Sequence, residues 1–435
     1  MAIIEPQMEN QNTIPIYARE ETPYDTLSKV LTFSNIDQEE YWRRIAPLLG
    51  KLLQQGSNYT IHQQYQHLCF YALHVIPLLG PFPVEGRSSY NCPLGGVGAI
   101  EPSQNFQKSG TSLRYTFEPT STGAISGRSD PFNRFMIDDA LSRFRQAGVR
   151  FNPHLYEALK KEVLLTDEEA EAICQHHDVP KMEFRAQACI AVDLDGGNMS
   201  VKLYVYPMLK ATLLNIPNWE LCLNAIRHVD GEGQFTSATA ALETYLRTQC
   251  PTTVREQTSA TTQVSYIACD LVDLQRARFK VYLFDLHVSF ERIITHWTMG
   301  GRLNDEVTMS GLGILRELWD ELKIPEGRRK PIERPPKPGD GPTMPLFFNY
   351  EMKAGDRLPK VKAYLPLVGM PEMPIARKLA AFFQRYGFPV EGRQYVDTLA
   401  GYFPDEDLEI VTHHQAFLSF SYSAKTGPYM TIYYH

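Results

Sequence analysis

Apolar and polar residues alternate strictly in several short segments of the chain. In "VKLYVYP" (201–207) the period of two places Val201, Leu203 and Val205 on one face of a strand, and Lys202 and Tyr204 on the other. β-branched and aromatic residues dominate this segment, as is typical of strands. The alternation therefore predicts a strand with one apolar face and one face that carries a lysine and tyrosines.

The same pattern returns along the chain at nearly equal intervals. Lys-x-Tyr occurs again at Lys280 and Lys362, so that successive lysines are 78 and 82 residues apart. Arg114 occupies the cationic position of "SLRYTFEP", 88 residues before Lys202, and the last segment, "GPYMTIYYH", carries tyrosines on one strand face. A single Lys-x-Tyr strand is most often a solvent-facing edge, but its recurrence at one spacing indicates a repeated structural unit.

Each of these strands follows a second strand-like segment, and helical patterns fill the intervals. Turn residues such as Asp195-Gly196-Gly197 join the two segments, as hairpins require. The segments that precede the cationic strands are 97–106, 184–194, 262–272, 345–352 and 415–423. Helical periodicity occurs at 37–56, 219–229, 237–249, 306–324 and 374–388.

The unit is therefore helix, helix, strand, strand, repeated about five times. Five hairpins give ten antiparallel strands, and a closed barrel would leave none of them with an exposed edge. We expect an α+β fold in which a ring of helices surrounds the barrel. Residues 35–435 are expected to form this single domain, preceded by a partly irregular N-terminal extension at 1–34.

In such a barrel the apolar faces pack against the helices, and the cationic faces point into the lumen. The same strand faces supply few carboxylates, so a buried ring of cations lacks partners within the protein. A multiply charged anion such as a diphosphate fits this ring, because Arg and Lys are well suited to bind phosphates. The tyrosine rings could stabilise a carbocation and exclude water from it. Diphosphate binding and carbocation shielding together describe prenyl transfer.

Composition and charge narrow the class of protein further. The chain has 435 residues, of which 43% are hydrophobic and 21% charged, a net charge of −7 and no basic, apolar leader at its start. The charge gives no support for binding to nucleic acid or to a membrane surface. The most apolar run, "HLCFYALHVIPLLGPFP" (67–83), is too short to span a bilayer and predicts a buried helix. Seven cysteines without a CxxC pair favour reduced thiols and a cytoplasmic protein.

The sequence contains no ligand set that is typical of a metal-dependent prenyltransferase. The most acidic segments, "IDDA" (137–140) and "PDEDLE" (404–409), lack DDxxD spacing. Histidine pairs at 176–177 and 413–414 lie in polar stretches and are expected to be exposed. We therefore expect no metal site and no required cofactor, with Mg²⁺ or Ca²⁺ as modulators at most.

From about residue 35 onward the chain resembles the soluble aromatic prenyltransferases of the dimethylallyltryptophan synthase type, known from fungal secondary metabolism. Together and in this order, the segments that carry the resemblance are highly specific: "IEPSQNFQKSGTSLRYTFEP", "VKLYVYP", "RFKVYLFD", "HWTMGGRL", "VKAYLPL" and "GPYMTIYYH". The resemblance implies the ten-stranded αββα barrel and a Friedel–Crafts-type alkylation of an aromatic acceptor by dimethylallyl diphosphate.

The resemblance also assigns roles to individual residues. Glu101 corresponds to the acidic residue that hydrogen-bonds the indole N–H. The ligands of the diphosphate fall on Arg114, Lys202, Arg278 and Lys280, and Lys362 is expected to join them although the family more often has glutamine there. The tyrosine shield falls on Tyr204, Tyr282, Tyr364, Tyr429 and Tyr433.

The nature of the acceptor is less constrained than the reaction. Some tryptophan-specific members of the family carry a lysine where this chain has Cys189 or a neighbour, which weakens the case for free tryptophan and leaves the terminal base unassigned. We expect an indole acceptor, with a tryptophan-containing cyclic dipeptide or a related indole alkaloid favoured. The alternatives are a tyrosine or phenolic polyketide acceptor, or a non-catalytic barrel that binds an amphipathic phosphate. The protein is expected to be a monomer or a homodimer.

Overall fold

The structure is a computed structural model that describes most of the chain. The described residues are 21–55, 59–84, 94, 99–127, 129–176, 179, 182, 185–257, 259–330, 339 and 341–435. Of the N-terminal extension expected at 1–34, residues 1–20 lie outside this part. Residues 23–30 form helix α1, in which Tyr24 stacks on Trp42 of the following helix.

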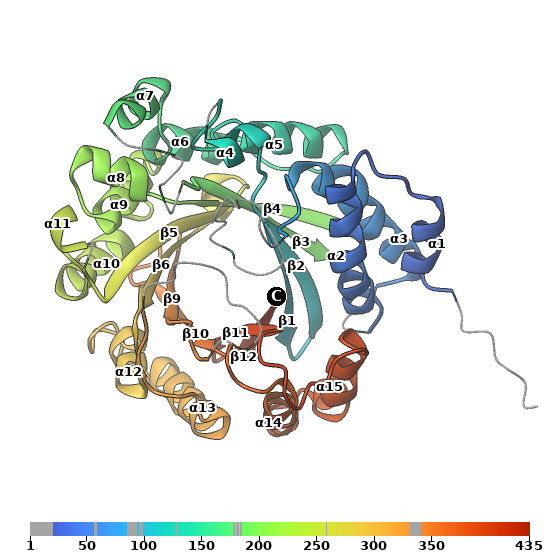
Figure 1. Cartoon of the computed structure of the whole chain (residues 1–435). Helices are drawn as coiled ribbons and strands as arrows, with labels where there is room; N and C mark the ends of the chain where they lie inside the picture. The colour runs from blue at the N-terminus through green and yellow to red at the C-terminus, as the bar shows by residue number, and fades with distance from the viewer. Residues whose placement is uncertain are drawn as a thin grey trace, which may run out of the picture.

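Ten antiparallel strands form a closed barrel at the centre of the molecule, as the sequence predicted (Figure 1). Their order around the barrel is β1-β12-β11-β10-β9-β6-β5-β4-β3-β2, so five hairpins follow one another and the first strand pairs with the last. The strands are β1 (Ile100–Gln107), β2 (Gly110–Phe117), β3 (Ala188–Asp195), β4 (Asn198–Val205), β5 (Thr262–Asp270), β6 (Arg278–Asp285), β9 (Leu346–Lys353), β10 (Lys360–Pro366), β11 (Gln415–Ser423) and β12 (Gly427–Tyr434).

Helices surround the barrel on its outside, and the chain passes once around the ring from the N-terminal to the C-terminal end (Figure 1). The helices are α1 (Pro23–Val30), α2 (Ile36–Gln55), α3 (Ile61–Phe70), α4 (Thr122–Ser126), α5 (Met136–Gln146), α6 (His154–Val163), α7 (Asp167–His176), α8 (Met208–Leu214), α9 (Asn218–Val229), α10 (Thr236–Gln249), α11 (Val254–Gln257), α12 (Phe290–Trp297), α13 (Glu306–Leu322), α14 (Glu372–Arg385) and α15 (Pro389–Tyr402).

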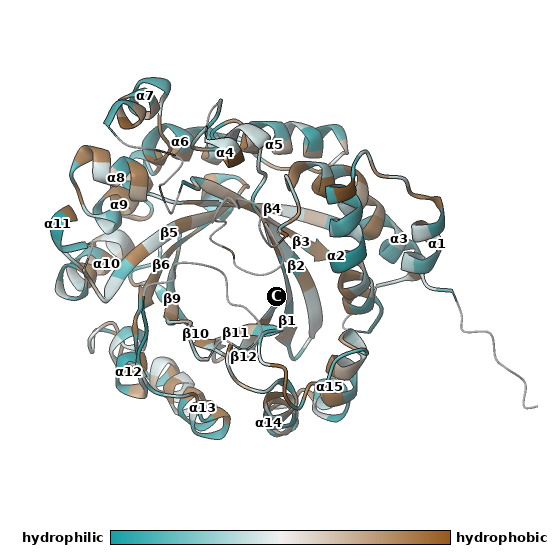
Figure 2. Cartoon of the chain, in the orientation of Figure 1, coloured by the Kyte–Doolittle hydropathy of each residue, from teal (hydrophilic) through white to brown (hydrophobic). Residues whose placement is uncertain are grey.

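Two separate hydrophobic clusters follow from the alternation along the strands. Val201, Leu203 and Val205 of β4 are buried in a large cluster that also contains the inner faces of the helices. Tyr204 and Tyr206 of the same strand belong to a second, smaller cluster inside the barrel. The ring helices carry hydrophobic and hydrophilic residues on different faces (Figure 2), because only one face of each packs against the strands. The period-two pattern therefore separates the wall of the barrel from its lumen.

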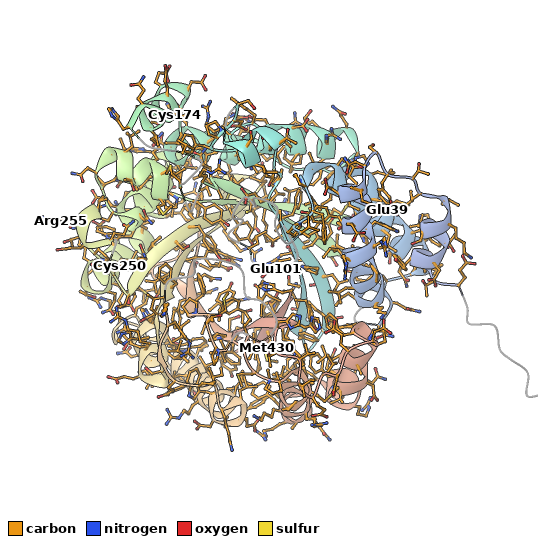
Figure 3. All side chains as sticks on the ribbon, viewed as in Figure 1. Glu39, Glu101, Cys174, Cys250, Arg255 and Met430 are labelled. Atoms are coloured by element: carbon orange, nitrogen blue, oxygen red, sulfur yellow. The ribbon has the colours of Figure 1, made fainter. Side chains whose placement is uncertain are left out.

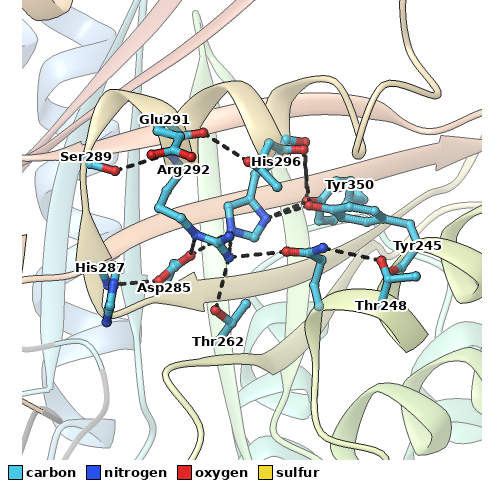
Figure 4. A network of polar contacts seen from close by, with 12 residues as sticks. Tyr245, Thr248, Thr262, Asp285, His287, Ser289, Glu291, Arg292, His296 and Tyr350 are labelled. Atoms are coloured by element: carbon cyan, nitrogen blue, oxygen red, sulfur yellow. Dashed lines mark hydrogen bonds and ion pairs between the residues drawn. The ribbon is translucent and has the colours of Figure 1, made fainter.

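A buried polar network attaches helix α12 to the barrel wall near the end of β6 (Figure 4). The Nε2–H of His296 donates to Asp285 (2.9 Å), and the Nδ1 of His296 accepts from the hydroxyl of Tyr245 (2.8 Å). Arg292 forms an ion pair with the same aspartate. Burial lowers the pKa of His296, although Asp285 opposes this shift, so the ring is neutral and makes both hydrogen bonds. Next to this network, β7 (His287–Val288) pairs with β8 (Gly327–Arg328) in a separate two-stranded sheet.

The apolar run at 67–83 is α-helical only as far as Phe70. Helix α3 ends at Phe70, a π-helical segment follows at Tyr71–Val75 and a 3₁₀ turn at Ile76–Leu78. Leu68, Tyr71 and Val75 are fully buried, which agrees with the predicted interior position. Within the described part of the chain, every helix is too short or too polar to traverse a bilayer.

Candidate active site

The predicted cations lie together on the inner faces of alternate strands of the barrel. Arg114 lies on β2, Lys202 on β4, and Arg278 and Lys280 on β6. Because β3 and β5 separate these strands in the barrel order, neighbouring cations are spaced by one intervening strand. The exposed fractions of their side chains range from 5% for Lys202 to 34% for Arg278, so the group is largely withdrawn from solvent.

Carboxylates on the intervening strands alternate with these cations. Asp193 of β3 forms ion pairs with both Arg114 and Lys202. Asp270 of β5 lies 3.2 Å from the Nζ of Lys202 and 2.5 Å from the Nε of Arg278. On β9, Glu351 lies 3.4 Å from the Nζ of Lys280 and 3.7 Å from Arg278. We call this alternating series the cation–carboxylate chain; it contains Arg114, Asp193, Lys202, Asp270, Arg278, Glu351 and Lys280.

The expectation that the buried cations lack carboxylate partners within the protein was wrong. It considered only the strand faces that carry cations, whereas the three acidic residues lie on the other strands between them. The register places Asp193 opposite Arg114, Asp270 opposite Lys202 and Glu351 opposite Lys280. Each carboxylate therefore holds a buried cation in place without a ligand.

The pKa values of the carboxylates in the cation–carboxylate chain reflect this pairing. Burial alone would raise the pKa of Asp193, but the charges of Arg114 and Lys202 outweigh it and hold the pKa well below its usual range. Burial acts on Asp270 in the same way, and the hydrogen bond from Arg278 together with the charge of Lys202 lowers its pKa to about 2. Both groups are therefore ionised at neutral pH.

Lys362 on β10 differs from the other cations because it has no ion pair among the described residues. Its Nζ lies 4.2 Å from the centroid of the Tyr429 ring, a cation–π geometry. Burial and the charges of Lys280 and Arg114 lower its pKa well below the usual value for lysine. Burial likewise lowers the pKa of Lys280 to about 8. The end of the cation–carboxylate chain next to Lys362 therefore carries the least compensated positive charge.

A cage of tyrosines lies next to the cations, two residues further along the same strands. Tyr204, Tyr282 and Tyr364 follow Lys202, Lys280 and Lys362 at this spacing, about 7 Å along each strand. Ring centroids are 6.1 Å apart for Tyr204 and Tyr282, 6.0 Å for Tyr282 and Tyr364, and 5.9 Å for Tyr364 and Tyr433.

Burial raises the pKa of Tyr204 to about 12, so its hydroxyl stays protonated. The structure thus brings together four of the five predicted shield tyrosines, while Tyr429 contacts Lys362 instead.

Sequence reasoning missed Tyr266, which stacks on Tyr282 at 4.3 Å between ring centroids. The register of β5 against β6 shifts between Val264 and Tyr266. Val264 packs among the residues of the outer cluster, and Tyr266 lies inside. A β-bulge thus interrupts the alternation that would have placed both residues on one face. Tyr206, for which the sequence suggested no role, packs edge-on against Tyr266 at 5.4 Å.

Glu101 on β1 points into the interior of the barrel, whereas Glu39 and Cys174 lie at the periphery (Figure 3). Its side chain is 11% exposed, and its Oε1 lies 2.9 Å from the Nε2 of His435, which directly follows β12. His435 was not among the predicted site residues. It becomes visible only through the pairing of β1 with β12, which joins segments more than 300 residues apart.

The expectation that both residues of the pair 413–414 are exposed was wrong, because His413 is half-buried and His414 is buried. The side chain of His414 stacks on Phe403 with 3.7 Å between ring centroids. Among the described residues, Glu406, His413 and His414 form a group whose ligand atoms lie within 4.8 Å of one another. Of the other pair, His177 lies outside the described residues, and His176 ends helix α7.

A family model described as tryptophan dimethylallyltransferase matches residues 37–398. The chain belongs to this family. Roquefortine prenyltransferase (roqD) from Penicillium rubens is 45% identical over 415 residues, which cover 95% of this chain and 94% of the relative. The match confirms the family resemblance found in the sequence, and it establishes that the protein is a prenyltransferase.

Solved structures confirm the fold of the prenyltransferase barrel. AnaPT from Neosartorya fischeri superimposes with a TM-score of 0.81 at 31% identity, covering 95% of this chain and 97% of the neighbour. NotF in complex with brevianamide F and DMSPP gives a TM-score of 0.79 at 33% identity, covering 95% and 98%. The roles of the individual site residues in this chain stay predictions.

Proposed function

We propose that this prenyltransferase transfers a dimethylallyl group from dimethylallyl diphosphate to an indole acceptor, and that the acceptor is a tryptophan-containing cyclic dipeptide or a related indole alkaloid. The observation that carries the proposal is the position of the cation–carboxylate chain directly next to the tyrosine cage within one closed barrel. The names of the relatives support it, since NotF is solved with brevianamide F and DMSPP.

The proposed reaction begins with the diphosphate of the donor beside Arg114, Lys202, Arg278, Lys280 and Lys362. The C–O bond of the donor breaks, and its electron pair leaves with the diphosphate, whose charge these side chains stabilise. The allyl cation forms between the tyrosine rings, which face it with their π-electrons and keep water out. A π-electron pair of the indole then forms the new C–C bond, and the alkylated ring loses a proton to a base that is not assigned.

Glu101 is proposed to hold the acceptor by accepting a hydrogen bond from the indole N–H. Its negative charge stabilises the positive charge that develops on the indole during attack, so the interaction strengthens toward the transition state. The donor side and the acceptor side of the site are thus assigned to different strands, β2 to β10 for the diphosphate and β1 for the indole.

The test is turnover of purified protein with dimethylallyl diphosphate, an indole-containing cyclic dipeptide and excess EDTA. We expect a product heavier by one dimethylallyl group, because the lysines and arginines take the place of a metal at the diphosphate. Lys280→Ala should weaken donor use by about 10- to 100-fold with every acceptor, since charge-assisted contacts contribute about 1.5–3 kcal/mol each. Arg316→Ala, on the exposed face of α13, serves as the matched control and should keep the wild-type rate.

Three outcomes would contradict the proposal. Binding without turnover across a broad acceptor panel would identify a non-catalytic barrel. Alkylation of only tyrosine or phenolic acceptors would overturn the indole assignment. Complete loss of turnover in EDTA, restored by Mg²⁺, would show that the cations do not suffice for ionisation.

A further inference from the structure

His435 contacts Glu101 at the seam where the first and last strands close the barrel. Glu101 lies on β1 and His435 directly after β12, the two strands that close the barrel. The Nε2 of His435 and the Oε1 of Glu101 are 2.9 Å apart, and the two side chains are 5% and 11% exposed. Since an ionised carboxylate only accepts hydrogen bonds, the Nε2 of His435 must carry the hydrogen and donate it.

The backbone of His435 is itself held by hydrogen bonds to His414. The N–H of His435 donates to the carbonyl oxygen of His414 (2.9 Å), and the Nδ1 of His414 lies 3.3 Å from the carbonyl oxygen of His435. The N–H of His414 donates in turn to Glu372 of α14 (2.7 Å). The backbone that carries the imidazole of His435 is therefore held by His414 and, through it, by helix α14.

A carboxylate has two oxygens, and His435 occupies one of them. A glutamate side chain rotates about three torsions, and without a partner its carboxylate would be free to turn away from the acceptor. With the Oε1 fixed by His435, the Oε2 is left to accept the indole N–H. We propose that His435 is a positioning residue for the acceptor, acting through Glu101. This inference rests on the function proposed above.

Two substitutions separate the hydrogen bond from the volume of the ring. His435→Phe keeps a flat ring and removes the donor, whereas His435→Gln places an amide N–H at a similar reach. We expect H435F to lower kcat/KM for the cyclic dipeptide by 10- to 100-fold, with the KM for dimethylallyl diphosphate unchanged. H435Q should recover most of this loss. H435N carries the same amide on a shorter side chain and should not recover it, which keeps the test valid if H435F fails to fold.

A double-mutant cycle with Glu101→Ala shows whether His435 acts through the carboxylate. In the E101A background, H435F should change kcat/KM for the acceptor by less than 2-fold. Losses that multiply in the double variant, equal losses in H435Q and H435F, or a raised donor KM would each overturn the proposal.

Failure of this inference can be distinguished from failure of the proposed function. If the wild type alkylates an indole and H435F stays within 2-fold of it, the positioning role is wrong and the function stands. If the wild type alkylates no indole, the function is wrong. The dissociation constant of the cyclic dipeptide then still tests the contact, with weaker binding expected in H435F than in H435Q and equal binding overturning it.

Discussion

At the scale of single residues, Asp193 shows how the barrel tolerates buried cations before the donor binds. Its carboxylate pairs with both Arg114 and Lys202, whose side chains are only 12% and 5% exposed. Asp193→Asn should therefore destabilise the ligand-free protein by about 3 kcal/mol, because it removes the carboxylate paired with Arg114 and leaves Lys202 with Asp270 alone. Inorganic diphosphate should stabilise this variant more than the wild type, since the anion replaces the lost charge. Chemical denaturation with and without diphosphate measures both effects.

The pH dependence of this effect has a defined sign. The pKa of Asp193 is depressed in the folded protein, so its stabilisation is fully present above about pH 4 and is lost as the pH falls through the folded pKa. Asp320→Asn is the matched control, because its ion pair with Arg316 is exposed and should contribute less than about 0.5 kcal/mol. Equal stabilisation of D193N and wild type by diphosphate would contradict the assignment of this site.

Lys362 gives the donor site a second pH dependence. Burial and neighbouring cations depress the pKa of Lys362, and burial lowers that of Lys280 to about 8. A bound diphosphate favours the charged form of both amines, so donor binding should take up protons above about pH 8. The affinity should fall as the pH rises, by up to about tenfold per pH unit for each proton that binding takes up. Calorimetry in buffers of different ionisation enthalpy counts the protons taken up on donor binding. The Lys362→Gln variant should take up fewer protons than the wild type. An unchanged number would show that Lys362 does not contact the diphosphate.

At the scale of elements, β4 assigns adjacent residues to two different tasks. Leu203 is fully buried against the helices, and Tyr204 belongs to the lumen cluster. Leu203→Ala should reduce the free energy of unfolding by about 2–5 kcal/mol and leave the products unchanged below the unfolding temperature.

Tyr204→Ala should raise the fraction of donor hydrolysed to dimethylallyl alcohol several-fold, because water then reaches the allyl cation. Product analysis by mass spectrometry measures this fraction, and Y204F, which keeps the π-face, should match the wild type.

The strands also show which parts of the fold and of the site can be predicted from the sequence. Five hairpins and the inward cations follow from the period-two alternation, which is a local property of each strand. Asp193 obeys the same alternation with Cys189 and Ala191, so a test of every strand for inward charge would have found it. The alternation could not predict Tyr266, because a bulge breaks the period. It could not predict His435 either, because the contact of His435 with Glu101 depends on which strands close the barrel.

At the scale of the whole molecule, the pairing of β1 with β12 determines whether the site is complete. The register runs from Ser103 opposite Tyr433 to Phe106 opposite Met430, so the closure brings Glu101 and His435 together. A closed barrel has no edge strand, and the amides of β12 should therefore exchange with solvent as slowly as those of β6, which is flanked by β5 and β9. Hydrogen exchange read by mass spectrometry tests this, with the peripheral helix α7 as the fast reference.

The opposite result would have a specific meaning for the site. If peptides from β1 and β12 exchanged together and well ahead of β6, the barrel would open at this seam under native conditions. Glu101 and His435 would then separate in the open form, and the carboxylate would be positioned only in the closed one. An indole ligand that binds Glu101 would have to favour closure, so it should slow exchange in β1 and β12 more than in β6. Equal slowing of exchange in all three strands would show that acceptor binding is not coupled to closure of the barrel.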